Sequence, residues 1–163
     1  MKKLFIVRHA KSSWDSPGIR DFDRVLMEVG KKRTRKVIQF LRQKEIKVDL
    51  IISSPAVRAY QTAKLIAKGI NYPIDSIKPE MKFYDGEIEQ ILDIIYGIAN
   101  DYSSIMIVGH NPTFSDLASL ILKTGIEMLP TTGVAAISFN TNNWEKVPES
   151  EVKLDFFISP KML

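Results

Sequence analysis

The sequence predicts a single α/β domain over residues 1–163, a three-layer α/β/α sandwich around a mainly parallel sheet. Short apolar runs alternate along the chain with longer segments of helical periodicity, which is typical of a parallel sheet covered on both faces. A chain of 163 residues, 45% hydrophobic and 26% charged, is long enough for one sizeable core. The chain shows no internal repeat or linker that would divide it.

Five apolar runs predict strands. Residues 4–7, 48–52 and 105–108 form short runs without polar alternation, so we expect buried strands there. Residues 134–139 and 152–157 predict two late strands, antiparallel or at an edge of the sheet. The crossovers between parallel strands should be right-handed, whereas the strand order cannot be derived from the pattern.

Four segments between these runs predict helices. Residues 26–44 carry apolar side chains at helical spacing, although Gly30 weakens the first turn. Ser54 and Pro55 are expected as the N-cap and first-turn proline of a helix that ends near residue 68. Residues 87–99 and 113–123 predict two further helices, and residues 72–85, broken by Pro73 and Pro79, should be irregular.

The composition excludes several classes of protein. The chain has no cysteine, which removes disulfides, thiolate metal sites and a cysteine nucleophile. The N-terminal apolar run ends at Arg8 after four residues, too short for a signal peptide, and no other stretch approaches a membrane span. We therefore expect a soluble, cytoplasmic protein with no membrane partner.

A basic cluster, residues 31–36, raises the question of nucleic acid. The cluster lies in the first predicted helix, so the favoured interpretation is the solvated face of an amphipathic helix. The alternatives are an acidic protein partner or non-specific binding of a polyanion. Nucleic-acid binding would leave both histidines of the chain unexplained, and the net charge of +4 is modest.

Each of the three buried strands is followed by a distinctive polar motif. Parallel strands bring such motifs to the edge where α/β proteins bind their ligands. Both histidines of the chain follow these strands directly. The motifs are Arg8-His9-Ala10-Lys11-Ser12, Ser53-Ser54-Pro55 with Arg58, and Gly109-His110-Asn111-Pro112.

Two arginines and two histidines at one edge indicate phosphoryl chemistry. The planar donor fork of arginine matches phosphate oxygens, so Arg8 and Arg58 predict a tetrahedral oxyanion between them. A neutral imidazole there can attack phosphorus, and the nearby positive charges should lower its pKa. We expect no metal and no cofactor, because the two cations repel a metal and the chain has no third histidine.

These motifs resemble the histidine phosphatase superfamily, which has the phosphoglycerate mutase-like fold. The resemblance runs from residue 4 to about residue 139 and includes Arg58-Ala59-x-Gln61-Thr62-Ala63 after the second strand. Arg-His-Ala-Lys-Ser, Gly-His-Asn-Pro and the short chain are most similar to the SixA-like branch of phosphohistidine phosphatases.

The resemblance implies a role for each site residue. His9 would be the nucleophile that becomes phosphohistidine, and Arg8, Arg58 and His110 would clamp the transferring group. Ser12, Asp15 and Asn111 would lie beside the phosphate.

Two positions depart from the family pattern. Ala10 stands where many members have glycine, and Asn111 stands where many carry an aspartate that acts as the acid. The candidate general acids are therefore Asp21, Asp85 and Glu80, with Asp23 and Glu87 nearby. A good leaving group such as phosphohistidine needs little protonation, which fits a poorly marked acid.

The short chain favours protein phosphohistidine as the substrate, because little length remains to build a lid over a small metabolite. The first alternative is a small-molecule phosphomonoesterase of the same chemistry. A second alternative, from a different class of protein, is a non-catalytic phosphate-binding module. Inactive relatives typically lack the nucleophile or a clamp residue, whereas this chain has His9, Arg8, Arg58 and His110. The sequence leaves the oligomeric state open.

Overall fold

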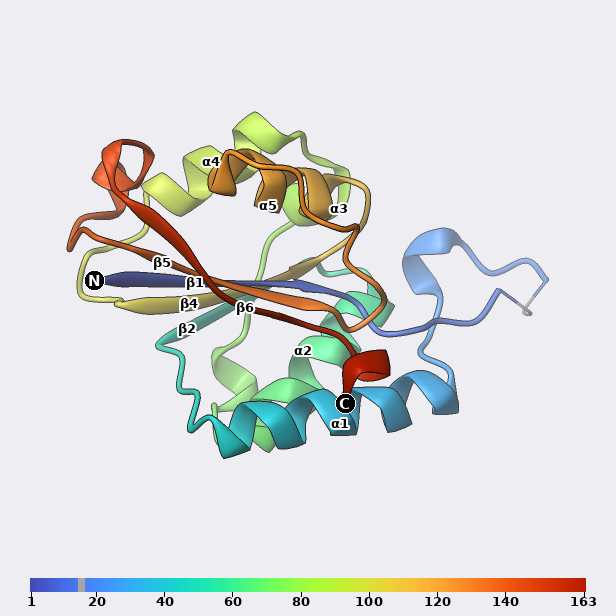
Figure 1. Cartoon of the computed structure of the whole chain (residues 1–163). Helices are drawn as coiled ribbons and strands as arrows, with labels where there is room; N and C mark the ends of the chain where they lie inside the picture. The colour runs from blue at the N-terminus through green and yellow to red at the C-terminus, as the bar shows by residue number, and fades with distance from the viewer. Residues whose placement is uncertain (15–16) are drawn as a thin grey trace.

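The computed structural model describes residues 1–14 and 17–163, and its centre is a six-stranded sheet between two layers of helices (Figure 1). The strand order is β3-β2-β4-β1-β5-β6. The first four strands in this order are parallel, and β5 runs antiparallel to both of its neighbours, β1 and β6. This arrangement confirms the predicted three-layer sandwich with a mainly parallel sheet. The strands are β1 (Lys2–Arg8), β2 (Leu50–Ser53), β3 (Lys78–Pro79), β4 (Ser104–Gly109), β5 (Val134–Phe139) and β6 (Val152–Ile158).

Two hydrophobic clusters hold the layers together, one on each face of the sheet. In β1, Leu4 and Ile6 pack into the cluster beneath α3, α4 and α5, whereas Phe5 and Val7 pack against α1 and α2 (Figure 1). Both faces of β1 are therefore buried, which explains its unbroken apolar run. The helices are α1 (Glu28–Gln43), α2 (Val57–Gly69), α3 (Lys82–Asp85), α4 (Ile88–Tyr96) and α5 (Thr113–Leu122).

Two predictions about local structure were wrong. The second helix begins at Val57 with Ala56 at its N-cap position, so Ser54 and Pro55 form a turn before the helix. Ser54 Oγ instead accepts a hydrogen bond from the Ala56 N–H at 3.2 Å. The stretch expected to be irregular contains β3, which pairs with β2 about 26 residues earlier in the chain, and the short helix α3.

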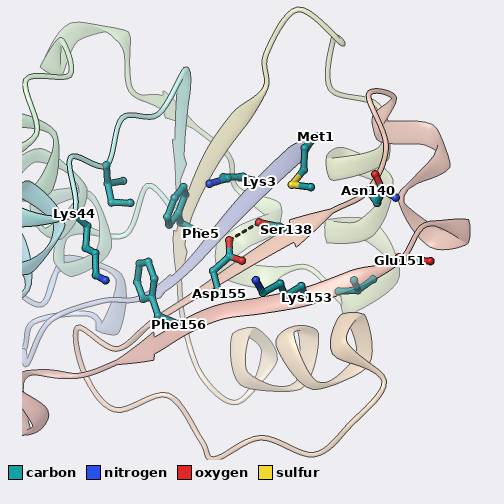
Figure 2. Close-up of a pocket in the computed structure, with 12 residues that line it drawn as sticks. Met1, Lys3, Phe5, Lys44, Ser138, Asn140, Glu151, Lys153, Asp155 and Phe156 are labelled. Carbon is teal, nitrogen blue, oxygen red and sulfur yellow. Dashed lines mark hydrogen bonds between the residues drawn. The ribbon is translucent and has the colours of Figure 1, made fainter.

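The antiparallel half of the sheet ends in β6, an edge strand with an irregular register next to Ala136. A hollow of about 710 Å³ lies here, bordered by Lys3, Phe5, Asp155 and Phe156 (Figure 2). It opens near the start of β1, away from the carboxyl ends of the parallel strands where ligands bind in such sheets.

Within the described part of the chain, none of the helices is long and apolar enough to cross a membrane.

Candidate active site

The sheet register brings the three polar motifs to one edge. Arg8 at the end of β1 pairs with Gly109 at the end of β4, and Ser53 at the end of β2 pairs with Val108. The residues that follow these strands therefore leave the sheet side by side. The rings of His9 and His110 lie with their centroids 5.2 Å apart.

His9 is held by its backbone and by one ring nitrogen. Its N–H donates to the Gly109 carbonyl at 3.0 Å, and the next N–H, of Ala10, donates to Thr62 Oγ1 at 2.9 Å. The Nδ1 atom lies 2.7 Å from the Ala10 carbonyl, which can only accept, so Nδ1 carries the proton. The lone pair of neutral His9 is therefore on Nε2. The side chain is buried, with 8% of the residue exposed.

The tautomer of His110 follows from its contact with Ser54. His110 Nε2 lies 2.8 Å from Ser54 Oγ, which already accepts from the Ala56 N–H. The Ser54 hydroxyl can then donate its proton to His110 Nε2, which leaves the ring proton on Nδ1. Nδ1 is buried and has no hydrogen-bond partner among the residues that the structure describes. In this tautomer Nδ1 is a buried N–H donor, on a ring whose centroid lies 5.2 Å from that of His9.

Both histidines are neutral near pH 7. Burial lowers the pKa of His9 to about 4; the hydrogen bond to Ala10 opposes this shift, while the charges of Arg58 and Arg8 add to it. Burial likewise lowers the pKa of His110 to about 3, with positive charge on His9 and Arg58 contributing. A neutral His9 with an unprotonated Nε2 is the form that can attack phosphorus.

The two arginines differ in how they are held. Arg8 Nη1 donates to the Leu129 carbonyl at 3.1 Å. Arg58, with 6% of the residue exposed, donates from Nη1 to the Asp21 carbonyl oxygen at 2.7 Å and from Nη2 to Asp21 Oδ2 at 3.0 Å. The Nε atoms of both arginines are buried without a partner within the described residues. Buried donors of this kind are rare unless a ligand satisfies them.

Asp21 lies over Arg58 in a network of three donors. Arg24 Nη1 donates to Asp21 Oδ1 at 3.0 Å, and the Tyr84 hydroxyl donates to Oδ2 at 2.9 Å. Burial alone would raise the pKa of Asp21, but hydrogen bonds from Arg24, Tyr84 and Arg58 outweigh it and lower the pKa to about 2. The ring of Tyr84 also packs edge-on against His110, with centroids 5.4 Å apart. Asp21 therefore occupies both Nη atoms of Arg58, one through its backbone carbonyl and the other through its ionised carboxylate.

Within the described residues, the carboxylates of the other candidate acids form no hydrogen bond with this network. Glu80 Oε2 accepts from the Lys82 N–H at 3.1 Å at the start of α3, and Asp85 is exposed at the end of that helix. Asp23 pairs with Arg20 at 2.9 Å on the surface. The role of general acid stays a prediction without an assigned residue.

Three residues were predicted to lie beside the phosphate. Ser12 is buried, and its hydroxyl accepts from Arg24 Nη2 at 2.7 Å. The Asn111 amide donates to the Leu129 carbonyl at 2.8 Å and accepts from the Ser115 hydroxyl at 2.7 Å. Asn111 thus ties the first turn of α5 to the loop that carries Leu129. Asp15 lies outside the described residues.

Sequence reasoning missed Arg24 and Tyr84. Arg24 could have been found from its i,i+3 spacing to Asp21, because residues of opposite charge at this spacing often form a local ion pair. Nothing in the local sequence pattern marks Tyr84, which stands among carboxylates in a largely exposed segment. Among the residues that the structure describes, no group of three or more histidine, cysteine, aspartate or glutamate side chains is placed to hold a metal ion.

Comparison with known proteins agrees with the geometry of the site. Residues 4–91 match the model of the histidine phosphatase superfamily (branch 1), and the chain belongs to that superfamily. An uncharacterised chloroplastic protein of Arabidopsis thaliana is 32% identical over 153 residues, which cover 89% of this chain and 70% of that protein. The phosphohistidine phosphatase SixA of Escherichia coli K12 is 23% identical over 154 residues, 90% of this chain and 94% of SixA.

A solved structure shows the same fold. The protein histidine phosphatase SixA complexed with tungstate superimposes with a TM-score of 0.85 at 20% identity, over 98% of each chain. Together with the family match, this similarity supports a phosphatase that uses a histidine nucleophile.

Proposed function

We propose that the chain is a metal-independent phosphatase in which His9 takes the phosphoryl group from phosphohistidine on a partner protein. The observation that carries this proposal is the state of His9. It is buried and neutral, its Nδ1 is held by a carbonyl, and its Nε2 is the free nucleophilic atom. Three buried N–H donors belong to the neighbours of His9 and have no partner among the described residues: Arg8 Nε, Arg58 Nε and His110 Nδ1.

The reaction has two steps. His9 Nε2 donates its lone pair to phosphorus while the bond from phosphorus to the substrate nitrogen breaks. When the other nitrogen of the substrate ring is protonated, the ring leaves as a neutral imidazole and needs no acid beside it. Water then attacks phosphorus, which releases inorganic phosphate and returns the electron pair to His9 Nε2.

The clamp stabilises the charge that the equatorial oxygens carry in both steps. Arg8, Arg58 and His110 donate from fixed positions, so little reorganisation accompanies the transfer. The Nη atoms of Arg58 become available to the phosphoryl group when its oxygens replace Asp21. SixA, which this chain resembles in fold, is described in complex with tungstate, a tetrahedral oxyanion that such a clamp would also hold.

The surface beside the site supports a protein substrate. Asp21 and Arg24, which form the network over Arg58, also line a small surface hollow together with Trp14. Trp14 is 75% exposed at this hollow, where it can contact a partner surface, and its ring also stacks on Arg24. A phosphorylated side chain presented by another protein would reach the site across this surface.

The test compares two substrates without added metal. The protein is incubated with a phosphohistidine-bearing phosphotransfer protein and, in parallel, with p-nitrophenyl phosphate. Both reactions are quenched in alkali and examined by mass spectrometry for a phosphoryl adduct on His9. We expect an adduct that forms and decays with turnover, and a higher kcat/KM for the phosphoprotein.

The His9→Ala variant is the matched control. It should lose turnover of both substrates and keep the thermal unfolding midpoint within a few degrees, because His9 contributes little to the two hydrophobic clusters. Retention of most activity by this variant would disprove the covalent mechanism. Turnover of the aryl phosphate alone would indicate a small-molecule phosphomonoesterase, and no turnover of either would indicate a binding module.

A further inference from the structure

A basic groove lies between α1 and the C-terminal turn Pro160–Met162. Three cations, Arg33, Lys36 and Lys161, line this groove, which has a volume of about 340 Å³. Its remaining walls are Pro130, Thr131, Ser159 and Pro160. Within the described part of the chain, none of the three cations forms a salt bridge, so their charges are uncompensated.

The groove and the candidate active site share the loop that carries Pro130 and Thr131. On one side of these residues, the Leu129 carbonyl accepts from Arg8 at 3.1 Å. On the other side, the Thr132 N–H donates to the His9 carbonyl at 3.2 Å. The same short loop therefore forms a wall of the groove and supports the backbone of the nucleophile.

Helix α1 is also anchored against the loop that follows β1. The Met27 N–H donates to the Lys11 carbonyl at 2.9 Å. Gly30 packs so closely that a Cβ at this position would lie 2.3 Å from the same Lys11 oxygen. The basic cluster of residues 31–36 begins directly after this contact, which places it near the site. In Figure 1 the C-terminal turn lies against α1.

We propose that this groove, lined by Arg33, Lys36 and Lys161, docks acidic side chains on the phosphohistidine protein. The proposal rests on the proposed function and adds the chemistry of the partner surface. Uncompensated cations in a concave site attract anions more strongly than cations on a flat surface do. A protein bound at His9 and carrying carboxylates beside its phosphorylated residue would place them over this groove.

The geometry favours a protein over a nucleic acid. Lys31, the first member of the basic cluster, forms a salt bridge with Glu28 at 3.1 Å, so the cluster is not one continuous row of free charges. The groove holds three cations and its lining contains no aromatic side chain for stacking on bases. Nucleic acids are bound along longer tracks of phosphate contacts.

The test is a charge reversal measured on two substrates with the same scissile bond. The Arg33→Glu/Lys36→Glu variant is assayed on an acidic phosphohistidine-bearing phosphotransfer protein and on free N-phosphohistidine. We expect kcat/KM for the protein to fall about tenfold, mainly through KM, because exposed charges act on association more than on chemistry. The value for free N-phosphohistidine should stay within about twofold, and the salt dependence of the protein reaction should weaken.

The matched control, Arg42→Glu/Lys47→Glu, makes the same change in net charge at the far end of α1, where both residues line a separate hollow. An equal loss in this control, or an equal loss on free N-phosphohistidine, would overturn the docking proposal while leaving the proposed function standing. An oligonucleotide that inhibits the unaltered protein but not the Arg33→Glu/Lys36→Glu variant would assign the groove to nucleic acid instead. Failure of the unaltered protein to act on the phosphoprotein would overturn the proposed function, and the docking proposal with it.

Discussion

The floor and the cover of the site are built differently. The floor, which we define as Arg8, His9 and His110, lies on strand ends, where backbone or buried partners hold each side chain. The cover, which we define as Asp21, Arg24 and Tyr84, comes from two connecting segments. The Asp21 side chain is 45% exposed, in contrast to buried His9. Arg58 lies between the two regions and is held by the cover.

This difference separates the parts that stay fixed from the parts that a substrate can displace. Buried donors on strand ends meet the transition state with little reorganisation. The Asp21 carboxylate is half-exposed, but the side chains of its partners Arg58 and Arg24 are largely buried, so a ligand that displaces it must supply oxygens in its place. A phosphate dianion with several oxygens can therefore replace the single carboxylate on Arg58. The floor should set kcat, and the cover should mainly affect the binding of the phosphoryl group.

Loss of Arg58 should have the largest effect on catalysis. We expect Arg58→Ala to lower kcat/KM by about a hundredfold or more, the usual cost of a lost oxyanion donor. Arg58→Lys should recover only part of this loss, since an ammonium lacks the planar fork. Steady-state kinetics with p-nitrophenyl phosphate measure both, and Arg20→Ala, an exposed arginine, serves as the control. A nearly silent Arg58→Ala would show that the clamp has been misplaced.

The buried histidines should make stability depend on pH. The pKa of His9 is lowered to about 4 and that of His110 to about 3, so below pH 6.5 the unfolded chain binds protons that the folded chain does not. The free energy of unfolding should thus fall as the pH drops from about 6.5 towards 4, by up to about 1.4 kcal/mol per pH unit for each histidine. Urea denaturation at pH 7.0 and 5.5 measures this effect. His9→Gln should reduce the slope, and a stability that is constant over this range would contradict the burial of the neutral rings.

Removal of the charge on Asp21 should have the smallest effect and tests the role of the cover. With a pKa of about 2, Asp21 is ionised at neutral pH and cannot donate a proton in this arrangement. Asp21→Asn removes the anion that competes for Arg58, so we expect a KM for p-nitrophenyl phosphate that is a few-fold lower and an almost unchanged kcat. Asp23→Asn, whose carboxylate pairs with Arg20, is the control.

A different result would give Asp21 a chemical role. General acid catalysis contributes about 10²–10⁴-fold, and most for poor leaving groups. A loss of kcat on this scale in Asp21→Asn, larger for an alkyl phosphate than for p-nitrophenyl phosphate, would identify Asp21 as the acid after all.

The sequence by itself predicted the layers of the fold and the floor of the site. Apolar runs such as residues 4–7 predict strands because burial on both faces leaves no polar alternation. A polar motif directly after a parallel strand must lie at the edge where ligands bind, so His9 and His110 could be placed together. Both inferences depend only on local pattern and on the common direction of the strands.

Tertiary structure alone decided the strand order, the cover and the basic groove. Asp21 and Tyr84 are 63 residues apart, and their hydrogen bond forms only because the segment before α1 meets α3 in the folded chain. Lys161 joins Arg33 and Lys36 only because the C-terminal turn packs on α1. Contacts between distant exposed side chains leave no periodic trace in a sequence, since neither burial nor local hydrogen bonding constrains which residues meet.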